Sequence, residues 1–230
     1  MDENFEKYAI IVAGGTGSRL GGGLPKQFRP LNGRPMAWWS MKAFHEADSS
    51  TRIILVVHPD YVGMWDELMS QLPPEDHVPH VVRGGGASRT ASVINGLEGV
   101  PMADNVLVAV HDAARPLVST GIISRGWVAG AESGAAVPAV AVTDSLRRVT
   151  DAGNEAVDRS EYVAVQTPQV FRAAVLKGAY QRFPDTVFSD DASATEAAGN
   201  VTALFDGDHA NMKVTNPGDI EIASLLLRQR

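Results

Sequence analysis

The sequence Tyr8-Ala-Ile-Ile-Val12 runs directly into Ala13-Gly14-Gly15-Thr16-Gly17-Ser18-Arg19-Leu20, and Pro25-Lys26-Gln27 follows a few residues later. A short apolar run that ends in glycines predicts a buried strand followed by a loop. Glycine has no Cβ, so the backbone N–H groups of such a loop can turn toward a bound anion. Arg19 and Lys26 add two cations close by. The stretch therefore predicts a loop that binds a polyphosphate.

Two familiar nucleotide-binding loops do not fit this stretch. The P-loop requires a Gly-Lys-Ser/Thr tripeptide, and the sequence contains none. The dinucleotide-binding fingerprint would place a third glycine where Leu20 stands. The next apolar run, 53–57, ends in His58-Pro59 and lacks the acidic residue that binds an adenosine ribose. A nicotinamide or flavin enzyme is therefore disfavoured.

The composition is that of a globular protein, with 230 residues, 44% hydrophobic and 20% charged. We interpret residues 1–230 as a single domain, because no repeat or linker divides them. The sequence has no cysteine, so it forms no disulfide and no thiolate metal site. A net charge of −7 disfavours a nucleic-acid binder. The lack of a signal peptide or long apolar span predicts a cytoplasmic protein without a membrane partner.

Apolar runs alternate with segments of helical length along the chain. The predicted strands are Ile10–Val12, Ile53–Val57, Val81–Val82, Val106–Val110 and Ala135–Val142. The predicted helices are Pro35–Ala47, Tyr61–Gln71, Ser88–Leu97 and Thr120–Ser133. This alternation predicts an α/β fold, with a mostly parallel sheet flanked by helices. Ligands of such sheets bind at the carboxyl ends of the strands.

One polar segment, Thr143–Glu161, interrupts the alternation. It contains the turn signal Asp151-Ala-Gly153-Asn154, so we predict a projecting β-hairpin arm. Such an arm either folds over its own site or crosses to another subunit, and the second case would give a homodimer with shared sites. A solvated surface loop explains the segment about as well.

The strand 106–110 leads into His111-Asp112-Ala-Ala-Arg115-Pro116, which places charges at the strand's exit. Asp112 could approach a metal ion or a ribose hydroxyl there, and Arg115 could bind a second phosphate. The alternative is an Asp–Arg pair that closes a turn. The six histidines show no zinc-binding spacing, and we interpret His111 as a residue that orients this loop.

A third loop, Arg83–Ser92, places three glycines before a predicted helix. Ser92 and the backbone of Gly86 and Ala87 are suited to hydrogen-bond a pyrimidine. An ordinary helix N-cap would need Ser88 alone, which explains neither the glycines nor Arg89.

Several motifs together resemble the 2-C-methyl-D-erythritol 4-phosphate cytidylyltransferase family over nearly the whole chain. They are the glycine loop with Pro25-Lys-Gln27, the Gly-Gly-x-x-Arg-x-x-Ser-Val motif ending at Val93, His111-Asp-Ala-Ala-Arg-Pro116, Val157-Asp-Arg159, Gln166-Thr-Pro-Gln169, Ser189-Asp-Asp-Ala-Ser193 and Asn211-Met-Lys-Val-Thr215. The resemblance implies a Rossmann-like nucleotidyltransferase fold, a homodimer with an exchanged arm, and Mg²⁺. It also implies the substrates CTP and methylerythritol phosphate, with CDP-methylerythritol and pyrophosphate as products.

The resemblance also implies a role for individual residues. Arg19 and Lys26 would stabilise charge on the α-phosphate, and Arg159 and Lys213 would hold methylerythritol phosphate, with Arg159 reaching from the partner's arm. The remaining acceptor contacts would be Asp112, Arg115, Ser145 and Thr167. CTP would be held by Ala13, Gly14, Gly15, Gly86, Ala87, Arg89, Ser92 and Asp112. Asp112 would also contact the metal, which CTP phosphates would mostly hold.

Three positions depart from the family pattern. Ser145 and Ser189 stand where threonine is frequent, and Ala87 stands where many relatives carry an acid. A ribitol-5-phosphate cytidylyltransferase shares Gly14-Gly15, but Val157-Asp-Arg159-Ser-Glu161 is more similar to the methylerythritol enzyme. A catalytically silent nucleotide-binding domain is the third interpretation, and the presence of Arg19 and Lys26 counts against it.

Overall fold

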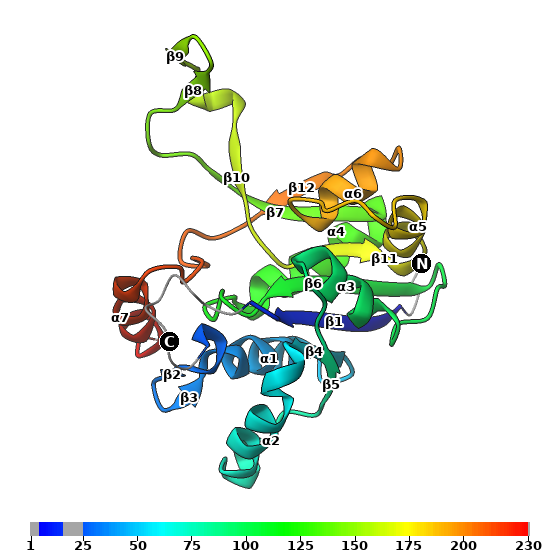
Figure 1. The fold of residues 1–230 in the computed structure, drawn as a ribbon, viewed down its shortest axis with the longest axis vertical. Helices are drawn as coiled ribbons and strands as arrows, with labels where there is room; N and C mark the ends of the chain where they lie inside the picture. The colour runs from blue at the N-terminus through cyan, green and yellow to red at the C-terminus, as the bar shows by residue number, and fades with distance from the viewer. Residues whose placement is uncertain (1–4, 16–24, 230) are drawn as a thin grey trace.

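The computed structural model describes residues 5–15 and 25–229. Their centre is a mixed sheet of eight strands in the order β10-β7-β11-β6-β1-β4-β5, with β12 beside β7 (Figure 1). These strands are β1 (Glu6–Ala13), β4 (Arg52–Val57), β5 (His80–Gly84), β6 (Val106–Asp112), β7 (Ala135–Ala141), β10 (Val163–Val165), β11 (Gln169–Arg172) and β12 (Ala203–Asp206). Two small ribbons pair β2 (Pro30–Leu31) with β3 (Arg34–Pro35) and β8 (Arg147–Thr150) with β9 (Gly153–Ala156).

Among the described residues, six helices pack on this sheet. They are α1 (Met36–Ala47), α2 (Val62–Ser70), α3 (Arg89–Leu97), α4 (Thr120–Ser133), α5 (Ala173–Arg182) and α6 (Asp191–Ala197). A further helix, α7 (Pro217–Leu227), packs beside β2 instead. Short 3₁₀ turns occur at η2 (Lys26–Phe28), η3 (Pro59–Tyr61), η4 (Pro74–Asp76) and η5 (Arg159–Glu161). The predicted α/β fold is confirmed, and each predicted strand and helix is present with bounds that differ by a few residues at most. In the described part of the chain, no helix is long and apolar enough to cross a membrane.

The strand order reverses beside β1. The chain first adds β4 and β5 on one side of β1, in parallel, and then places β6 on the other side, also in parallel. Such a reversal leaves a crevice at the carboxyl ends of the two diverging strands, where α/β proteins bind ligands. The sheet is mixed beyond β6: β11 lies antiparallel to both β6 and β7, and β10 is antiparallel to β7, whereas β12 is parallel to β7.

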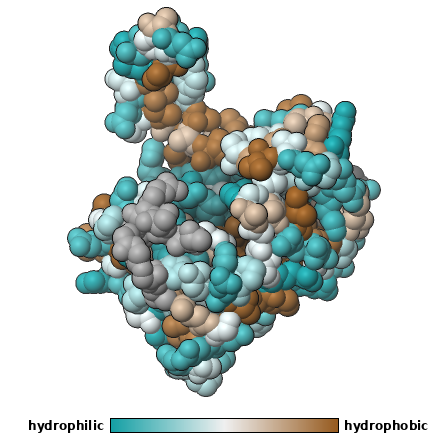
Figure 2. All heavy atoms as spheres, viewed as in Figure 1, coloured by the Kyte–Doolittle hydropathy of each residue, from teal (hydrophilic) through white to brown (hydrophobic). Residues whose placement is uncertain are grey.

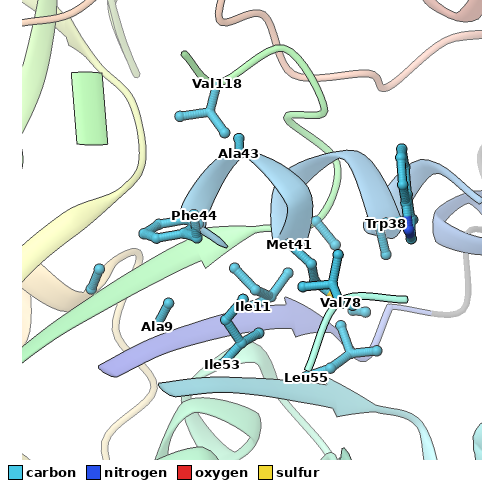
Figure 3. Packing of buried hydrophobic residues seen from close by; sticks show 14 of the residues in the cluster. Ala9, Ile11, Trp38, Met41, Ala43, Phe44, Ile53, Leu55, Val78 and Val118 are labelled. Carbon is cyan, nitrogen blue, oxygen red and sulfur yellow. The ribbon is translucent and has the colours of Figure 1, made fainter. Parts of the chain in front are cut away.

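Apolar side chains cover both faces of the central strands, which explains the continuous apolar runs in the sequence. In β1, Ile11 joins a cluster under α1 and α4, whereas Ile10 joins a cluster with residues of α3 and α5. Figure 3 shows the first cluster, in which Met41 and Phe44 of α1 lie over Ile11 and its neighbours. The two clusters fix the ends of β1 and β6 in place, and these ends carry the candidate site.

The predicted arm is a β-hairpin, in which β8 and β9 pair antiparallel from Arg147 opposite Ala156 to Thr150 opposite Gly153. Gly153 has a φ of 132°, a conformation that favours glycine at the turn. The arm projects away from the sheet beyond β7 and β10 (Figure 1), and apolar residues gather on it and at its base (Figure 2). One apolar residue of the hairpin is Val149 in β8, which is 82% exposed.

Candidate active site

The glycine loop begins at the end of β1, and the side chain of Gln27 hydrogen-bonds to its first residues. The Gln27 amide Nε2 donates to the carbonyl oxygens of Ala13 at 2.6 Å and Gly15 at 2.9 Å, and the residue is only 2% exposed. Because both carbonyls accept from Gln27, they face the protein and not the cavity. The neighbouring Lys26 donates from Nζ to the carbonyl oxygen of Val214 at 3.2 Å.

Sequence reasoning quoted Gln27 within a motif but gave it no role. Its amide joins the start of the loop to the turn that carries Lys26, since two carbonyls on one side of the loop bond to a residue on the other. The sequence signal available for Gln27 was its amide side chain between a lysine and an aromatic residue, and the structure shows that this amide is buried. The predicted Arg19 lies outside the residues that the structure describes.

The loop between β5 and α3 lies against the glycine loop, as predicted. Ser88 caps α3 by accepting from the amide of Ala91 at 3.0 Å, and the Ser92 hydroxyl accepts from the Gly86 amide at 3.1 Å. A Cβ on Gly14 would lie 3.0 Å from Ser92 Oγ, and one on Gly86 would lie 2.5 Å from the Cβ of Ala91. Glycine at these two positions therefore lets both loops approach α3 closely.

Asp112 ends β6 with its carboxylate held by two cations. Its Oδ1 accepts from Arg89 Nε at 3.2 Å, and its Oδ2 accepts from Lys213 Nζ at 2.7 Å. The backbone N–H of Asp112 donates to Thr167 Oγ1 at 3.1 Å. Burial alone would raise the pKa of Asp112, but the charges of Arg89 and Lys213 outweigh it and hold the pKa well below its ordinary value. The carboxylate is therefore ionised at neutral pH.

These groups surround one cavity of about 470 Å³ at the carboxyl ends of the central strands. Its lining residues are Val12, Gly14, Gly15, Lys26, His58, Gly86, Ala87, Ser88, Arg89, Ser92, Asp112, Ala114 and Lys213. A larger cavity, of about 570 Å³, lies beside α1 and α7, but none of the predicted site residues lines it. The smaller cavity is the candidate active site, because the predicted anion-binding loops and cations converge there.

The other predicted residues take two different positions. Thr167 and Arg115 are not among the residues that line the cavity. Thr167 accepts from the backbone N–H of Asp112, and Arg115 Nη1 donates to the carbonyl oxygen of Asn211 at 2.8 Å. Ser145 and Arg159 lie on the arm and line a separate hollow there. In one chain, the structure therefore brings most of the predicted CTP contacts together with Lys213 and leaves the arm residues apart.

His111 orients the loop after β6, as its sequence position indicated. Its Nε2 bonds to the carbonyl oxygen of Arg115 at 3.1 Å, and its Nδ1 lies 3.1 Å from Thr167 Oγ1. A carbonyl can only accept, so Nε2 carries the hydrogen, and the Thr167 hydroxyl donates to Nδ1. Burial lowers the pKa of His111 to about 4, so the ring is neutral at neutral pH.

This burial predicts a pH dependence of stability. The unfolded chain protonates His111 near its ordinary pKa of 6.5, whereas the folded chain does not until about pH 4. The unfolded state therefore binds more protons between these values, and the unfolding free energy should fall by roughly 3 kcal/mol as the pH drops from 6.5 to 4. Urea titrations of wild type and His111→Gln test this, since the fall should be smaller in the variant. Parallel pH profiles would contradict the assignment.

The site can accommodate Mg²⁺ only with help from a ligand. No cluster of three or more metal-binding side chains occurs among residues 5–15 and 25–229, and Asp112 is the one carboxylate among the described residues that line the cavity. Mg²⁺ is commonly held by one or two carboxylates together with substrate phosphates. The donor set therefore fits a Mg²⁺ ion that arrives with a nucleotide.

Two glycine loops and several cations meet at a strand-order reversal, as in nucleotide-binding proteins with a Rossmann-like fold. Residues 8–229 match the family model IspD: 2-C-methyl-D-erythritol 4-phosphate cytidylyltransferase. The chain belongs to this family, which confirms the resemblance drawn from its motifs.

Individual relatives cover almost the same length. The enzyme named 2-C-methyl-D-erythritol 4-phosphate cytidylyltransferase from Bacteroides thetaiotaomicron is 44% identical over 97% of this chain and 100% of its own. A protein of that name from Porphyromonas gingivalis is also 44% identical, over 96% of this chain and 98% of its own. The crystal structure of the Thermus thermophilus enzyme superposes with a TM-score of 0.75 at 33% identity, covering 97% of this chain and 99% of that one.

Proposed function

We propose that the protein transfers the cytidylyl group of CTP to 2-C-methyl-D-erythritol 4-phosphate and releases pyrophosphate, in non-mevalonate isoprenoid biosynthesis. The observation that carries this proposal is the cavity in which two glycine loops meet Lys26, Lys213 and Asp112. Membership of the cytidylyltransferase family supports the choice of CTP and of the acceptor.

In this reaction a phosphate oxygen of the acceptor attacks the α-phosphorus of CTP, and the bond to the pyrophosphate oxygen breaks. The step needs positioning and neutralisation of charge more than a nucleophilic side chain. Lys26 lines the cavity together with Gly14 and Gly15, and it would stabilise charge on the α-phosphate together with Arg19. The carbonyls of Ala13 and Gly15 accept from Gln27, so among the described residues the amides of Gly14 and Gly15 would bind phosphate oxygens.

The acceptor would lie on the Lys213 side of the cavity. Lys213 is exposed and already contacts Asp112, so its ammonium is close enough to receive the acceptor's phosphate beside that carboxylate. Arg115 and Thr167 fix the loop that carries Asp112. Mg²⁺, bound through Asp112 and the phosphates of CTP, would neutralise phosphate charge.

We further propose a homodimer in which each arm completes the partner's site. Ser145 and Arg159 lie apart from the cavity of their own chain, which supports a contribution in trans. An isolated two-stranded ribbon is marginally stable, so the hairpin of β8 and β9 would be stabilised by a partner subunit. That subunit would also cover the exposed apolar residues of the arm and its base, which are Val149, Tyr162, Val163 and Val165. Location in the cytoplasm stays a prediction.

The test of the proposed function is pyrophosphate release by the purified protein with CTP and Mg²⁺. Three parallel reactions contain methylerythritol phosphate, ribitol 5-phosphate or no acceptor. We expect release with methylerythritol phosphate alone, and loss of that release when EDTA removes the metal. Release with ribitol 5-phosphate alone would move the protein to the neighbouring specificity. CTP binding without release in any reaction would favour a silent nucleotide-binding domain.

A further inference from the structure

The carboxylate of Asp191 is fully buried and has no role in the reaction described above. Asp191 begins α6, and its backbone amide donates to Gln169 Oε1 at 3.0 Å. Its Oδ1 accepts from the Tyr180 hydroxyl at 2.6 Å, and its Oδ2 accepts from Arg89 Nη2 at 2.8 Å. Burying a carboxylate is destabilising unless hydrogen bonds and a counter-charge compensate. This site supplies both, and the counter-charge is Arg89.

Arg89 lies between two carboxylates. Its Nη2 bonds to Asp191, and its Nε bonds to Asp112 at 3.2 Å on the cavity side. Burial lowers the pKa of Arg89, but the charges of Asp191 and Asp112 outweigh it, so the pKa lies above its ordinary value. A guanidinium is planar, with donors in a fixed fork, so a contact on one edge sets the direction of the other. The position of Asp191 therefore decides where Arg89 meets Asp112.

The charges of this cluster also balance. Two carboxylates, Asp112 and Asp191, contact two cations, Arg89 and Lys213. Lys213 is exposed and pairs with Asp112, whereas the charge of Arg89 is shared between Asp112 and Asp191. Arg89 therefore brings little net positive charge to the cavity, although the family resemblance implied a contact with CTP.

We propose that Asp191 is a positioning residue, which holds the Arg89 guanidinium against Asp112 so that Arg89 orients this carboxylate instead of binding a phosphate group of CTP. The proposal rests on the proposed function, because Asp191 would act on the reaction through Asp112, the carboxylate that would bind the metal and lie beside the acceptor. Gln169 and Tyr180 complete the support by fixing Asp191 from two further elements.

Asp191→Asn tests the proposal, with Asp190→Asn as its matched control. Asp190 is the adjacent carboxylate; it caps α6 and bonds to Gln169 Nε2, and asparagine is an equally good cap. We expect Asp191→Asn to lower kcat/KM for methylerythritol phosphate by about 10- to 100-fold, as when a residue that orients an active-site ligand is removed. Measured in EDTA, so that a metal ion at Asp112 does not contribute, the dissociation constant of CTP should stay within about twofold for this and the variants below. Asp190→Asn should change both quantities by less than about threefold.

Two variants of Arg89 keep the proposal testable even where Asp191→Asn does not fold. Lysine is a point charge without the fork, so Arg89→Lys should lose acceptor kcat/KM almost as Arg89→Gln does, and both should keep CTP affinity. Added to Asp191→Asn, Arg89→Gln should cause little further loss, because the two residues act in one chain of contacts. Weaker CTP binding by about tenfold or more in Arg89→Gln, with normal binding in Arg89→Lys, would overturn the proposal.

A crystal structure gives a readout that is independent of turnover. In Asp191→Asn the Arg89 Nε should leave Asp112, whereas in Asp190→Asn it should keep its 3.2 Å contact. An unmoved Arg89 in Asp191→Asn would overturn the proposal. Wild type is assayed first with CTP and methylerythritol phosphate: failure there contradicts the proposed function, while CTP affinities and the crystal structures still decide the role of Asp191.

Discussion

Lys26→Ala is expected to lower kcat by about 10²- to 10³-fold or more, the range found when one group that stabilises transition-state charge is removed. The reason is the position of Lys26, whose ammonium lies at the cavity beside the glycine loop. Negative charge grows on the transferred phosphate as the attacking and leaving oxygens share the phosphorus. An interaction made mainly in the transition state affects kcat, so the dissociation constant of CTP should change much less. Steady-state kinetics and calorimetry measure the two quantities.

The matched control is Lys42→Ala, the same change on α1 at a partly exposed lysine that pairs with Glu46, lies over the Trp38 and Trp39 rings and does not line the candidate site. It should leave kcat within about twofold, because an exposed ion pair contributes little. Lys26→Arg keeps the charge and should retain more activity than Lys26→Ala. Near-normal turnover of a folded Lys26→Ala protein would show that Lys26 does not stabilise the reacting phosphate.

The sequence predicted the central part of the fold because local signals and tertiary structure agree there. The apolar run of β1 is buried on both faces, and glycines follow it where the chain passes close to α3. The same holds for β6, whose seven residues are all buried, with Asp112 as the last of them. The ends of parallel strands meet at one edge of a sheet, so adjacency of the two glycine loops and Asp112 followed from topology.

The sequence predicted β7 but not β10 and β11, the two strands that pair with it antiparallel. β10 and β11 have three and four residues, too few to show a period, and β10 is exposed along its whole length. Gln169 begins β11 as a buried polar residue, which an apolar pattern cannot reveal. These strands return from the arm, so their direction depends on where the arm leaves the sheet.

Side-chain partnerships were also beyond the sequence. Arg89 and Asp191 are 102 positions apart, and only the packing of α3 and α6 against α5 makes them neighbours. The family resemblance implied that Arg89 contacts CTP, whereas the buried carboxylate of Asp191, which shares its charge, is the basis of the positioning role proposed above. The spacing of strands and loops along the sequence predicts which residues lie at one end of the sheet. Which of these residues form ion pairs with one another depends on side-chain geometry, which the sequence does not show.

Mixed dimers test the exchange of arms, and the expected recovery of activity is large. Arg159→Ala and Lys26→Ala homodimers should each be nearly inactive, because each lacks one group in both sites. If arms cross, a mixed dimer has one site with Lys26 from one subunit and Arg159 from the other. A freely exchanged equimolar mixture should then regain roughly a quarter of wild-type activity, since half of the dimers are mixed and half of their sites are intact.

The geometry of the arm makes this outcome specific. Arg159 lies with Ser145 at the hollow on the arm and not at the cavity of its own chain, so loss of Arg159 in cis should spare that chain's site. Arg148→Ala is the matched control, because Arg148 lies on the same hairpin as an exposed partner of Glu155. Arg148→Ala homodimers should stay active within about twofold. Mixed dimers isolated with two affinity tags that recover nothing would refute a site shared between subunits.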